Sequence, residues 1–412
     1  MSRRGGRSAA GRAFLAVATV FGVLTGAALA GAGPAGAAPA ARRIAPGVTY
    51  RQFDVDAAAG TARAHLLTVD LAHPHVRVDL LHPGAVAARA TVSRLADSAG
   101  AVAGVNGDFF HITETQHPGV AATGAPVGPA VAGGRVLKAA VPDGQRFGPA
   151  LPPGTSARDV FGVGADRRAR VDRLSLAGAV GTPEGRLPLG GLNQYALPEN
   201  SVGAFTARWG DASRARAVCG TDARRSAPCS GDAYEVTVRG GRVTSVSGAP
   251  GGGAIPAGTT VLVGREEGAR RLRGLSVGDP VAVTHTLTAA SSRVPYRFAL
   301  GGFPVLRHGR PLPGLDDATA AVRTAVGFRR GGRQMLLLAL DGSADYRTGL
   351  TVAEEAATMR SLGASDAFNL DGGGSTELVA RDADADAVTV RNHPSGGAER
   401  PVPNGIGVFS TA

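Results

Sequence analysis

QMLLLALDG at residues 334–342 and AFNLDGGGST at residues 367–376 are two apolar runs that each end in Asp-Gly. The first run is continuously apolar, which is typical of a strand that is buried on both faces of a sheet. The second is shorter and leads into three consecutive glycines. The sequence therefore predicts two buried strands whose ends carry Asp341 and Asp371, with both carboxyl groups at one edge of a sheet.

A helix is expected between these strands, at residues 351–362, because Thr351 can cap it and Glu354 stands at the capping-box position. A second helical pattern covers residues 86–99. Shorter strands separated by glycine-rich turns are expected at 61–68, 76–81, 101–105, 234–238, 243–246, 259–263, 280–288 and 323–328. This pattern predicts an α+β fold: a single large domain over residues 44–410, with mixed or mainly antiparallel sheets and packed helices.

Residues 1–40 are predicted to be a signal peptide. Four arginines precede an apolar stretch at 13–30, no acidic residue occurs before Asp54, and small residues at 35–40 fit a cleavage site. The apolar stretch is barely long enough to span a bilayer, which favours cleavage over retention as an anchor. We therefore expect a protein that is secreted or lies in the cell envelope, with no stable membrane insertion after leader removal.

The net positive charge of the chain does not indicate a nucleic-acid partner. The net charge is +11, and it becomes +7 when the four arginines of the predicted leader are removed. Lys138 is the only lysine, and the remaining basic residues are arginines scattered along the sequence without a zinc motif or a basic helix. A positive surface is nevertheless compatible with an anionic substrate.

The two cysteines, Cys219 and Cys229, are predicted to form a disulfide bond. An even number of cysteines in an exported chain favours such a bridge. A zinc site would need further ligands, and no neighbouring histidine in the sequence supplies them.

The strongest candidate for chemistry is the stretch NLDGGGST at 369–376. Paired carboxylates at a sheet edge suit acid–base work at a glycosidic centre or metal binding. The run Gly372–Thr376 could form a nest of backbone N–H groups around an anion, with two hydroxyl groups added. The plainer interpretation is that each Asp-Gly only opens a turn after its strand. No lysine of a phosphate-binding loop is present, so nucleotide binding is not indicated.

These residues resemble the phosphodiester glycosidase family, whose members release a sugar from a phosphodiester. The likeness runs from about Gly47 to Ser410, and its ordered motifs are VNGDFF (105–110), GGFPVL (301–306), RTAVGF (323–328), DG (341–342), NLDGGGST (369–376) and NGIGV (404–408). Two departures are visible. Ser343 stands where the family commonly has Arg, with Arg347 as a replacement four residues later, and Glu377 follows the signature.

The resemblance implies a hydrolase that cleaves the glycosidic bond of a sugar-1-phosphodiester in an envelope or extracellular glycan. Asp371 is the expected catalytic group, and Asp341 or Asp108 is expected to supply a second carboxylate. The implied substrate-binding residues are Asn106, Arg323, Arg347, Asn369, Gly372, Gly373, Gly374, Ser375 and Thr376. In this scheme a guanidinium group clamps the phosphate oxygens, because its fork matches them bidentately.

Several alternatives remain open at this level. Asn106 and Asp108 can equally cap a turn, Glu354 can serve only its helix, and His111 is more often packed than catalytic in such a position. No cofactor is required, although a calcium or magnesium ion held by Asp341 and Asp371 is compatible with the residues. A phosphodiesterase that cleaves P–O and a non-catalytic binder of phosphorylated polysaccharide are the competing functions.

Overall fold

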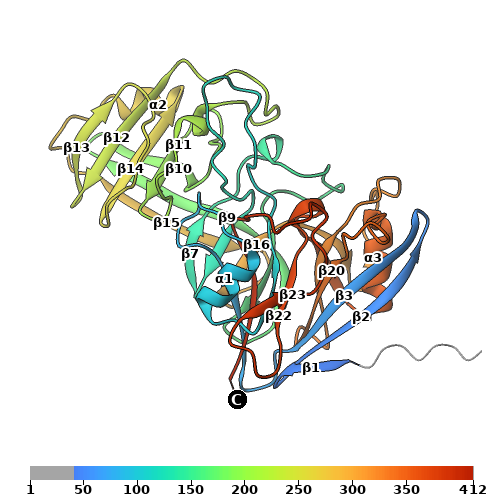
Figure 1. Ribbon diagram of the computed structural model, residues 1–412. Coiled ribbons are helices and arrows are strands. Elements are labelled where there is room, and N and C mark those ends of the chain that lie inside the picture. The colour runs from blue at the N-terminus through green and yellow to red at the C-terminus, as the bar shows by residue number, and fades with distance from the viewer. Residues whose placement is uncertain (1–40, 412) are drawn as a thin grey trace, which may run out of the picture. The chain divides into compact units, whose positions relative to one another are not determined.

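The computed structural model describes residues 41–411, so the predicted signal peptide at 1–40 lies outside the described residues. Strands dominate the described part (Figure 1). Its three α-helices have only 8, 6 and 10 residues, and they are α1 (Val92–Ala99), α2 (Glu267–Leu272) and α3 (Val352–Ser361). The predicted α+β class with packed helices is therefore wrong, and the protein is mostly β. Helices this short cannot cover large sheets, and one buried core draws side chains from all three sheets.

The first sheet has eight strands, and every pairing in it is antiparallel. Its order is β1 (Arg42–Ala45), β2 (Val48–Ala57), β3 (Gly60–Asp70), β20 (Gln334–Leu340), β19 (Thr324–Arg329), β21 (Asp366–Asn369), β17 (Phe303–Arg307) and β18 (Arg310–Pro311). The apolar run of β20 lies in the interior of this sheet, and Met335–Leu340 are at most 1% exposed. The predicted double-sided burial of this strand is confirmed. α3 packs against β17 and β21 of this sheet.

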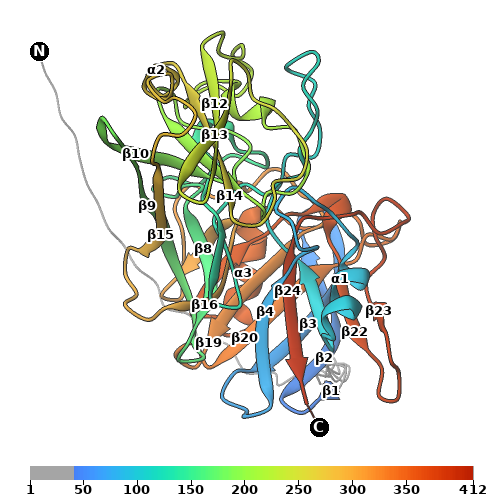
Figure 2. The same ribbon diagram turned by 90° about the vertical axis from the view of Figure 1, so that its left-hand side faces the viewer.

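The second sheet has five antiparallel strands and receives α1 (Figure 2). Its order is β23 (Val388–Val390), β22 (Leu378–Arg381), β5 (Ala103–Asn106), β24 (Gly405–Ser410) and β4 (Val76–Leu81). The central strand β5 is fully buried and leads directly into the segment that follows Asn106.

The third sheet has eleven strands and contains the single parallel pairing among the described residues, between β10 and β11. Its order is β13 (Arg242–Ser247), β12 (Ala233–Arg239), β14 (Thr259–Arg265), β11 (Val202–Thr206), β10 (Gly185–Leu192), β9 (Ala169–Thr182), β8 (Asp159–Gly164), β16 (Tyr296–Gly301), β6 (Ala130–Ala132) and β7 (Arg135–Lys138), with β15 (Ala282–Ala289) also paired to β9. The strands predicted at 234–238 and 243–246 are confirmed as β12 and β13, which form an antiparallel hairpin.

The two predicted helices, at 351–362 and 86–99, had different outcomes. For α3, Thr351 and Glu354 form the predicted capping box. The helix predicted from residue 86 begins only at Val92, after the N-cap Thr91. Earlier residues are diverted because the backbone N–H groups at 86 and 87 donate to carbonyls at 208 and 209. No helix within residues 41–411 is long and apolar enough to cross a membrane.

Strand register places the ends of β20 and β21 at one edge of the eight-stranded sheet. Both strands run antiparallel to β19, and Ala325 of β19 is paired with Leu338 on one side and Asn369 on the other. Since β20 and β21 therefore run in the same direction, Asp341 and Asp371 leave the sheet at the same end. What surrounds each carboxyl group decides what it can do.

Candidate functional site

Asp371 follows β21 and is tied to the five-stranded sheet by its backbone. Its N–H donates to Gly107 O (2.9 Å), and its carbonyl accepts from Asn106 Nδ2 (2.7 Å). One carboxylate oxygen accepts from the N–H of Gly372 (3.0 Å). The site is thus built where the end of a strand in one sheet meets the end of β5 in another.

The environment of Asp371 favours its neutral form. Burial raises the pKa of Asp371 to about 7, and the nearby charge of Asp108 acts in the same direction. The Ser375 hydroxyl, the Arg400 guanidinium and the Gly372 N–H oppose this rise without cancelling it. The residue is still partly exposed. A carboxyl group with a pKa near neutrality can both give and accept a proton at physiological pH.

Asp108 is the second carboxylate of this site, and it is only 2% exposed. Its N–H donates to Asn404 Oδ1 (2.9 Å), and its Oδ2 accepts from the N–H of Gly128 (2.6 Å). Its Oδ1 is buried without a hydrogen-bond partner in the described part of the chain. Burial raises the pKa of Asp108, against the nearby positive charges of Lys138 and Arg146. An unpaired buried oxygen is costly unless a ligand or water completes it.

Glycine is required where the backbone closes around Asp108. A Cβ atom on Gly301, the last residue of β16, would approach Asp108 Oδ2 and the Cα of Gly128 too closely. Because β16 belongs to the eleven-stranded sheet, this contact brings a third sheet to the site. The motifs at 105–110 and 301–306 therefore meet in space. The motifs at 369–376 and 404–408 each contact the 105–110 motif as well.

The glycine-rich run does not form the expected nest of free N–H groups. Gly372 donates to Asp371 Oδ1, Gly373 to Val322 O (2.7 Å), Ser375 to Gly372 O (3.1 Å) and Thr376 to Gly373 O (3.1 Å). Within the run 372–376, only the N–H of Gly374 has no acceptor among the described residues. The short 3-10 turn at 373–375 uses the donors of Ser375 and Thr376, whereas those of Gly372 and Gly373 are taken by Asp371 and Val322. The backbone can thus offer one donor to an anion, and not five.

Arg400 supplies the positive charge beside this loop, and sequence reasoning missed it. Its Nη1 donates to Ser375 Oγ (3.3 Å), and a Cβ on Gly374 would collide with its guanidinium group. Its charge also acts on Asp371. Arg400 lies in an irregular segment before β24, so no periodicity or local motif could have identified it.

The two arginines that were predicted to clamp phosphate are placed elsewhere. Arg323 is 7% exposed and donates to backbone carbonyls, from Nε to Leu350 O (2.6 Å) and from Nη2 to Thr319 O (2.8 Å). Arg347 is exposed, and no hydrogen bond from its side chain is present in the described residues. Neither guanidinium group contacts the glycine-rich loop, so that position belongs to Arg400.

The carboxylate of Asp341 has no free hydrogen-bonding capacity, although it shares the sheet edge with Asp371. Its carboxylate lies 3.1 Å from His65 Nε2 and 2.9 Å from His393 Nδ1, and it accepts from the N–H of Ser343 (2.8 Å). Burial disfavours its charge, but these hydrogen bonds outweigh burial and hold the pKa of Asp341 well below its ordinary value. A carboxylate in this state is a poor general acid. The geometry favours Asp108 over Asp341 as the partner of Asp371.

Asn106, Asn369 and Thr376 differ in what they can still bind. Asn106 is fully committed, because its Oδ1 accepts from Thr324 Oγ1 (2.7 Å) and from the N–H of Glu377 (3.0 Å). It therefore positions the Asp371 segment. The amide of Asn369 and the hydroxyl of Thr376 are buried without hydrogen-bond partners in the described part. These two side chains retain donors and acceptors for a ligand or water.

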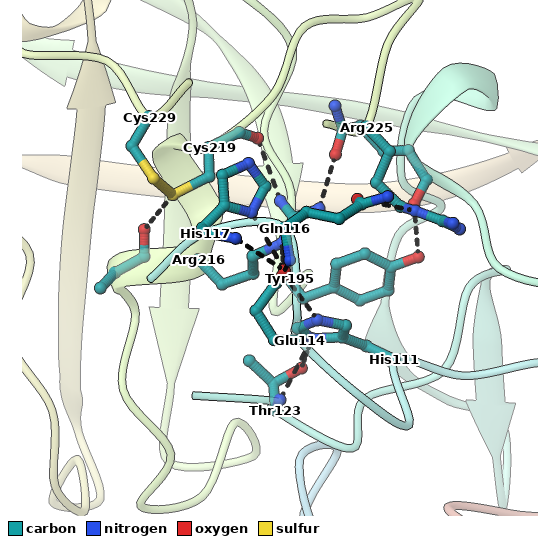
Figure 3. A network of polar contacts seen from close by, with 12 residues as sticks. His111, Glu114, Gln116, His117, Thr123, Tyr195, Arg216, Cys219, Arg225 and Cys229 are labelled. Atoms are coloured by element: carbon teal, nitrogen blue, oxygen red, sulfur yellow. Dashed lines mark hydrogen bonds and ion pairs between the residues drawn. A yellow bond between two sulfur atoms is a disulfide. The ribbon is translucent and has the colours of Figure 1, made fainter. Parts of the chain in front are cut away.

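His111 is a packed residue in a separate polar network (Figure 3). Its ring lies 3.0 Å from Thr123 Oγ1 and 3.0 Å from Glu114 Oε2, and it stacks on Tyr195. Burial lowers the pKa of His111 to about 4, so the ring is neutral at physiological pH. Its side chain is fully buried and cannot touch a substrate in this arrangement.

The predicted disulfide between Cys219 and Cys229 is confirmed. Within residues 41–411, the only group of three residues that could hold a metal ion consists of these two cysteines and His117. The sulfur atoms are consumed by the bridge. In the described part of the chain, no third His, Cys, Asp or Glu joins Asp371 and Asp341, or Asp371 and Asp108, to form a metal site. The calcium or magnesium ion stays an untested prediction.

Comparison with known proteins connects this site to one family. Residues 232–409 match the phosphodiester glycosidase family model, which includes Asp371 and Arg400 but not Asp108. No curated protein sequence matches the chain. The predicted full-length family domain at 44–410 therefore remains a prediction beyond the matched segment.

Solved structures with a similar fold include a hypothetical protein of Synechocystis (21% identity, TM-score 0.66, 89% of this chain and 62% of that one). A protein of Burkholderia pseudomallei described as exported is also similar (23% identity, TM-score 0.65, 85% and 74%). The catalytic domain of the zebrafish N-acetylglucosamine-1-phosphodiester alpha-N-acetylglucosaminidase aligns more loosely (15% identity, TM-score 0.43, 90% and 86%). The first two likenesses show a shared fold, and this chain spans less than two thirds of the Synechocystis protein.

Proposed function

We propose that the segment matching phosphodiester glycosidases belongs to a working hydrolase, which cleaves the glycosidic bond of a sugar-1-phosphodiester. The observation that carries the proposal is the setting of Asp371. Its pKa is raised to about 7, it adjoins the Arg400 guanidinium and the charge of Asp108, and it lies inside the matched residues 232–409. A carboxyl pair suits hydrolysis of a glycosidic bond, and a guanidinium group at one side can bind the phosphate.

The reaction breaks the bond between the anomeric carbon and the phosphate oxygen. The bonding electrons leave with the phosphate, water adds its oxygen to the anomeric carbon, and one water proton is taken up by a carboxylate. Asp371 is the proton-exchanging group, because its pKa lies near neutrality. Asp108 supplies negative charge opposite the developing positive charge of the sugar. A phosphodiester is already a good leaving group, so strong acid assistance is not needed.

Arg400 and the free N–H of Gly374 form the proposed phosphate-binding side of the site. A guanidinium group can bind two phosphate oxygens, and a backbone N–H adds a neutral donor. Asn369 and Thr376 support binding of sugar hydroxyls, since their buried polar atoms have no partner among the described residues. Pairing such atoms with a ligand removes an existing cost of burial.

We also propose that the protein acts outside the cytoplasm on an envelope or extracellular glycan. The leader-like residues 1–40 support export. The disulfide bond supports an oxidising compartment, because such bonds rarely persist in the cytosol. The sugar and the group beyond the phosphate are open within this class.

The test is hydrolysis in oxygen-18 water of a panel of methyl diesters of hexose 1-phosphate and N-acetylhexosamine 1-phosphate. Label in the released sugar and unlabelled phosphate monoester are expected. Label in the phosphate would instead identify a phosphodiesterase that cleaves P–O. Binding of these diesters without turnover, unchanged in Asp371→Asn, would identify a non-catalytic binder.

A further inference from the structure

Lys138 is the only lysine in a chain that holds 44 basic residues. It is the last residue of β7, and its side chain is fully buried. A buried ammonium group costs free energy unless its three N–H donors and its charge are compensated. The other basic residues of the chain are arginines, so this position is the exception to the composition of the protein.

All three donors of Lys138 are used by backbone carbonyls close to Asp108. Its Nζ lies 3.1 Å from Val127 O, 2.5 Å from Gly128 O and 2.5 Å from Ala139 O. Gly128 is the same residue whose N–H donates to Asp108 Oδ2. Gly128 thus links the two side chains. Its carbonyl accepts from the ammonium group of Lys138, and its N–H donates to the carboxylate of Asp108.

The two buried charges also influence each other electrostatically, although they form no ion pair. Burial lowers the pKa of Lys138, and the charge of Asp108 opposes this. Burial raises the pKa of Asp108, and Lys138 is the strongest opposing influence. The other ionisable groups that act on this carboxyl or are influenced by it are Arg146, Asp371 and Tyr195. Each member of the pair favours the charged form of the other.

We propose that Lys138 is a positioning residue for the catalytic carboxylate Asp108. Lys138 fixes the backbone of Gly128, whose N–H binds the Asp108 carboxylate, and its positive charge keeps that carboxylate ionised. The catalytic part of this inference rests on the proposed function, whereas the link between the two groups through Gly128 does not. Because the donors converge on three carbonyls within one small space, a compact ammonium group fits where a planar guanidinium fork does not. This explains a lysine at one position of an arginine-rich chain.

The presence of one lysine makes a direct titration feasible. Protein grown with lysine that carries carbon-13 at Cε gives a single lysine side-chain resonance in NMR spectra. In the native chain its titration midpoint is expected well below the 10.5 of an ordinary lysine. In Asp108→Asn the midpoint is expected to fall further, because the attraction to the carboxylate is lost. A midpoint near the ordinary value, or one unaffected by Asp108→Asn, would overturn the proposal.

The effect on catalysis is measured with Lys138→Met and a matched control, Arg265→Met. Arg265 is also a buried cation, and it donates to Leu197 O (3.3 Å), Gly220 O (2.9 Å) and the carboxylate of Glu266 (2.9 Å), and not to Asp108 or Gly128. Loss of Lys138 should raise the pKa of Asp108 and move the acidic limb of the kcat/KM profile upward by about one pH unit or more. Arg265→Met should leave that limb in place.

The two proposals fail in different ways. If no sugar phosphodiester is hydrolysed, the proposed function fails while the NMR titration still decides the link between Lys138 and Asp108. If turnover is found but the acidic limb is identical in Lys138→Met and the native protein, the positioning role is wrong. If Lys138→Met does not fold, the native titration and the Asp108→Asn titration decide the matter.

Discussion

Asp341 and Asp371 share a local sequence and a sheet edge but have opposite electrostatic states. Each follows a buried apolar strand and precedes glycine, and register brings both to the same end of the eight-stranded sheet. Asp341 is surrounded by donors and its pKa is lowered. Burial and, to a smaller extent, the neighbouring Asp108 raise the pKa of Asp371, which has fewer donors. The strand and turn therefore place a carboxyl group, but residues from distant segments decide whether it is a structural anion or a proton-exchanging group.

The largest difference is expected when each aspartate is replaced by asparagine. Asp371→Asn should lower kcat on a sugar phosphodiester by roughly 10²–10⁴-fold, the usual contribution of a general acid or base. Asp341→Asn should keep kcat within about tenfold and lose about 1–3 kcal/mol of unfolding free energy, because buried hydrogen bonds are broken. Steady-state kinetics and denaturant unfolding of both variants check this. Equal losses of kcat at equal stability would remove the distinction.

A second difference concerns the arginines near the two edge positions. Arg400→Met should reduce kcat/KM by roughly 10- to 100-fold, because a charge-assisted hydrogen bond to phosphate is worth about 1.5–3 kcal/mol. Arg347→Met is the matched control, since Arg347 is exposed and should leave kcat/KM unchanged. Arg323→Met should lower stability through its lost bonds to Leu350 and Thr319. An effect on KM from Arg347 but not from Arg400 would reverse the assignment.

The free energy of unfolding at acidic pH should depend on the ionisation of Asp341. A carboxylate whose folded-state pKa is depressed stabilises the fold above its unfolded-state pKa near 3.8, and this contribution is lost as pH falls through the folded-state value. The native protein should therefore exceed Asp341→Asn by about 1–3 kcal/mol at pH 6. The gap should begin to narrow as pH falls below 3.8 and should be smaller at pH 2 than at pH 6. Urea unfolding between pH 6 and pH 2 measures it, and a gap independent of pH would contradict the ionised state of Asp341.

The smallest effect is expected from Gly374→Ala. The added Cβ would displace the Arg400 guanidinium from the loop, which the side chain can partly accommodate. We expect kcat/KM to fall by less than about tenfold, or about 1 kcal/mol, with unchanged stability. Gly248→Ala is the control, because its Cβ would meet no atom within 4 Å. If both variants behave like the native protein, Arg400 does not act next to Gly374.

Local patterns in the sequence were enough to predict β20, β21 and α3. Apolar periodicity and a capping box are properties of neighbouring residues, so they can be read without the fold. The helix content was overestimated because residues 86–91 have a helical composition but give backbone N–H groups to 208 and 209. Such competition depends on tertiary contacts.

The site was predicted only in part, for the same reason. Asp371, Asp108 and Asn106 were found because they lie in recognisable motifs, and the structure brings them together. The saturation of Asp341 depends on His65, 276 residues away, and on His393. Arg400 reaches the glycine-rich loop from an irregular segment. These contacts leave no trace in local sequence, so the roles first given to Asp341, Arg323 and Arg347 could not be judged before the fold was known.

The most direct test of the central claim is NMR titration of the aspartate carboxyl carbons, assigned with Asp371→Asn and Asp341→Asn. The opposite environments predict a midpoint of about 7 for Asp371 and one below the ordinary 3.8 for Asp341. An Asp371 midpoint at or below 3.8, or two aspartates that titrate together, would contradict the account.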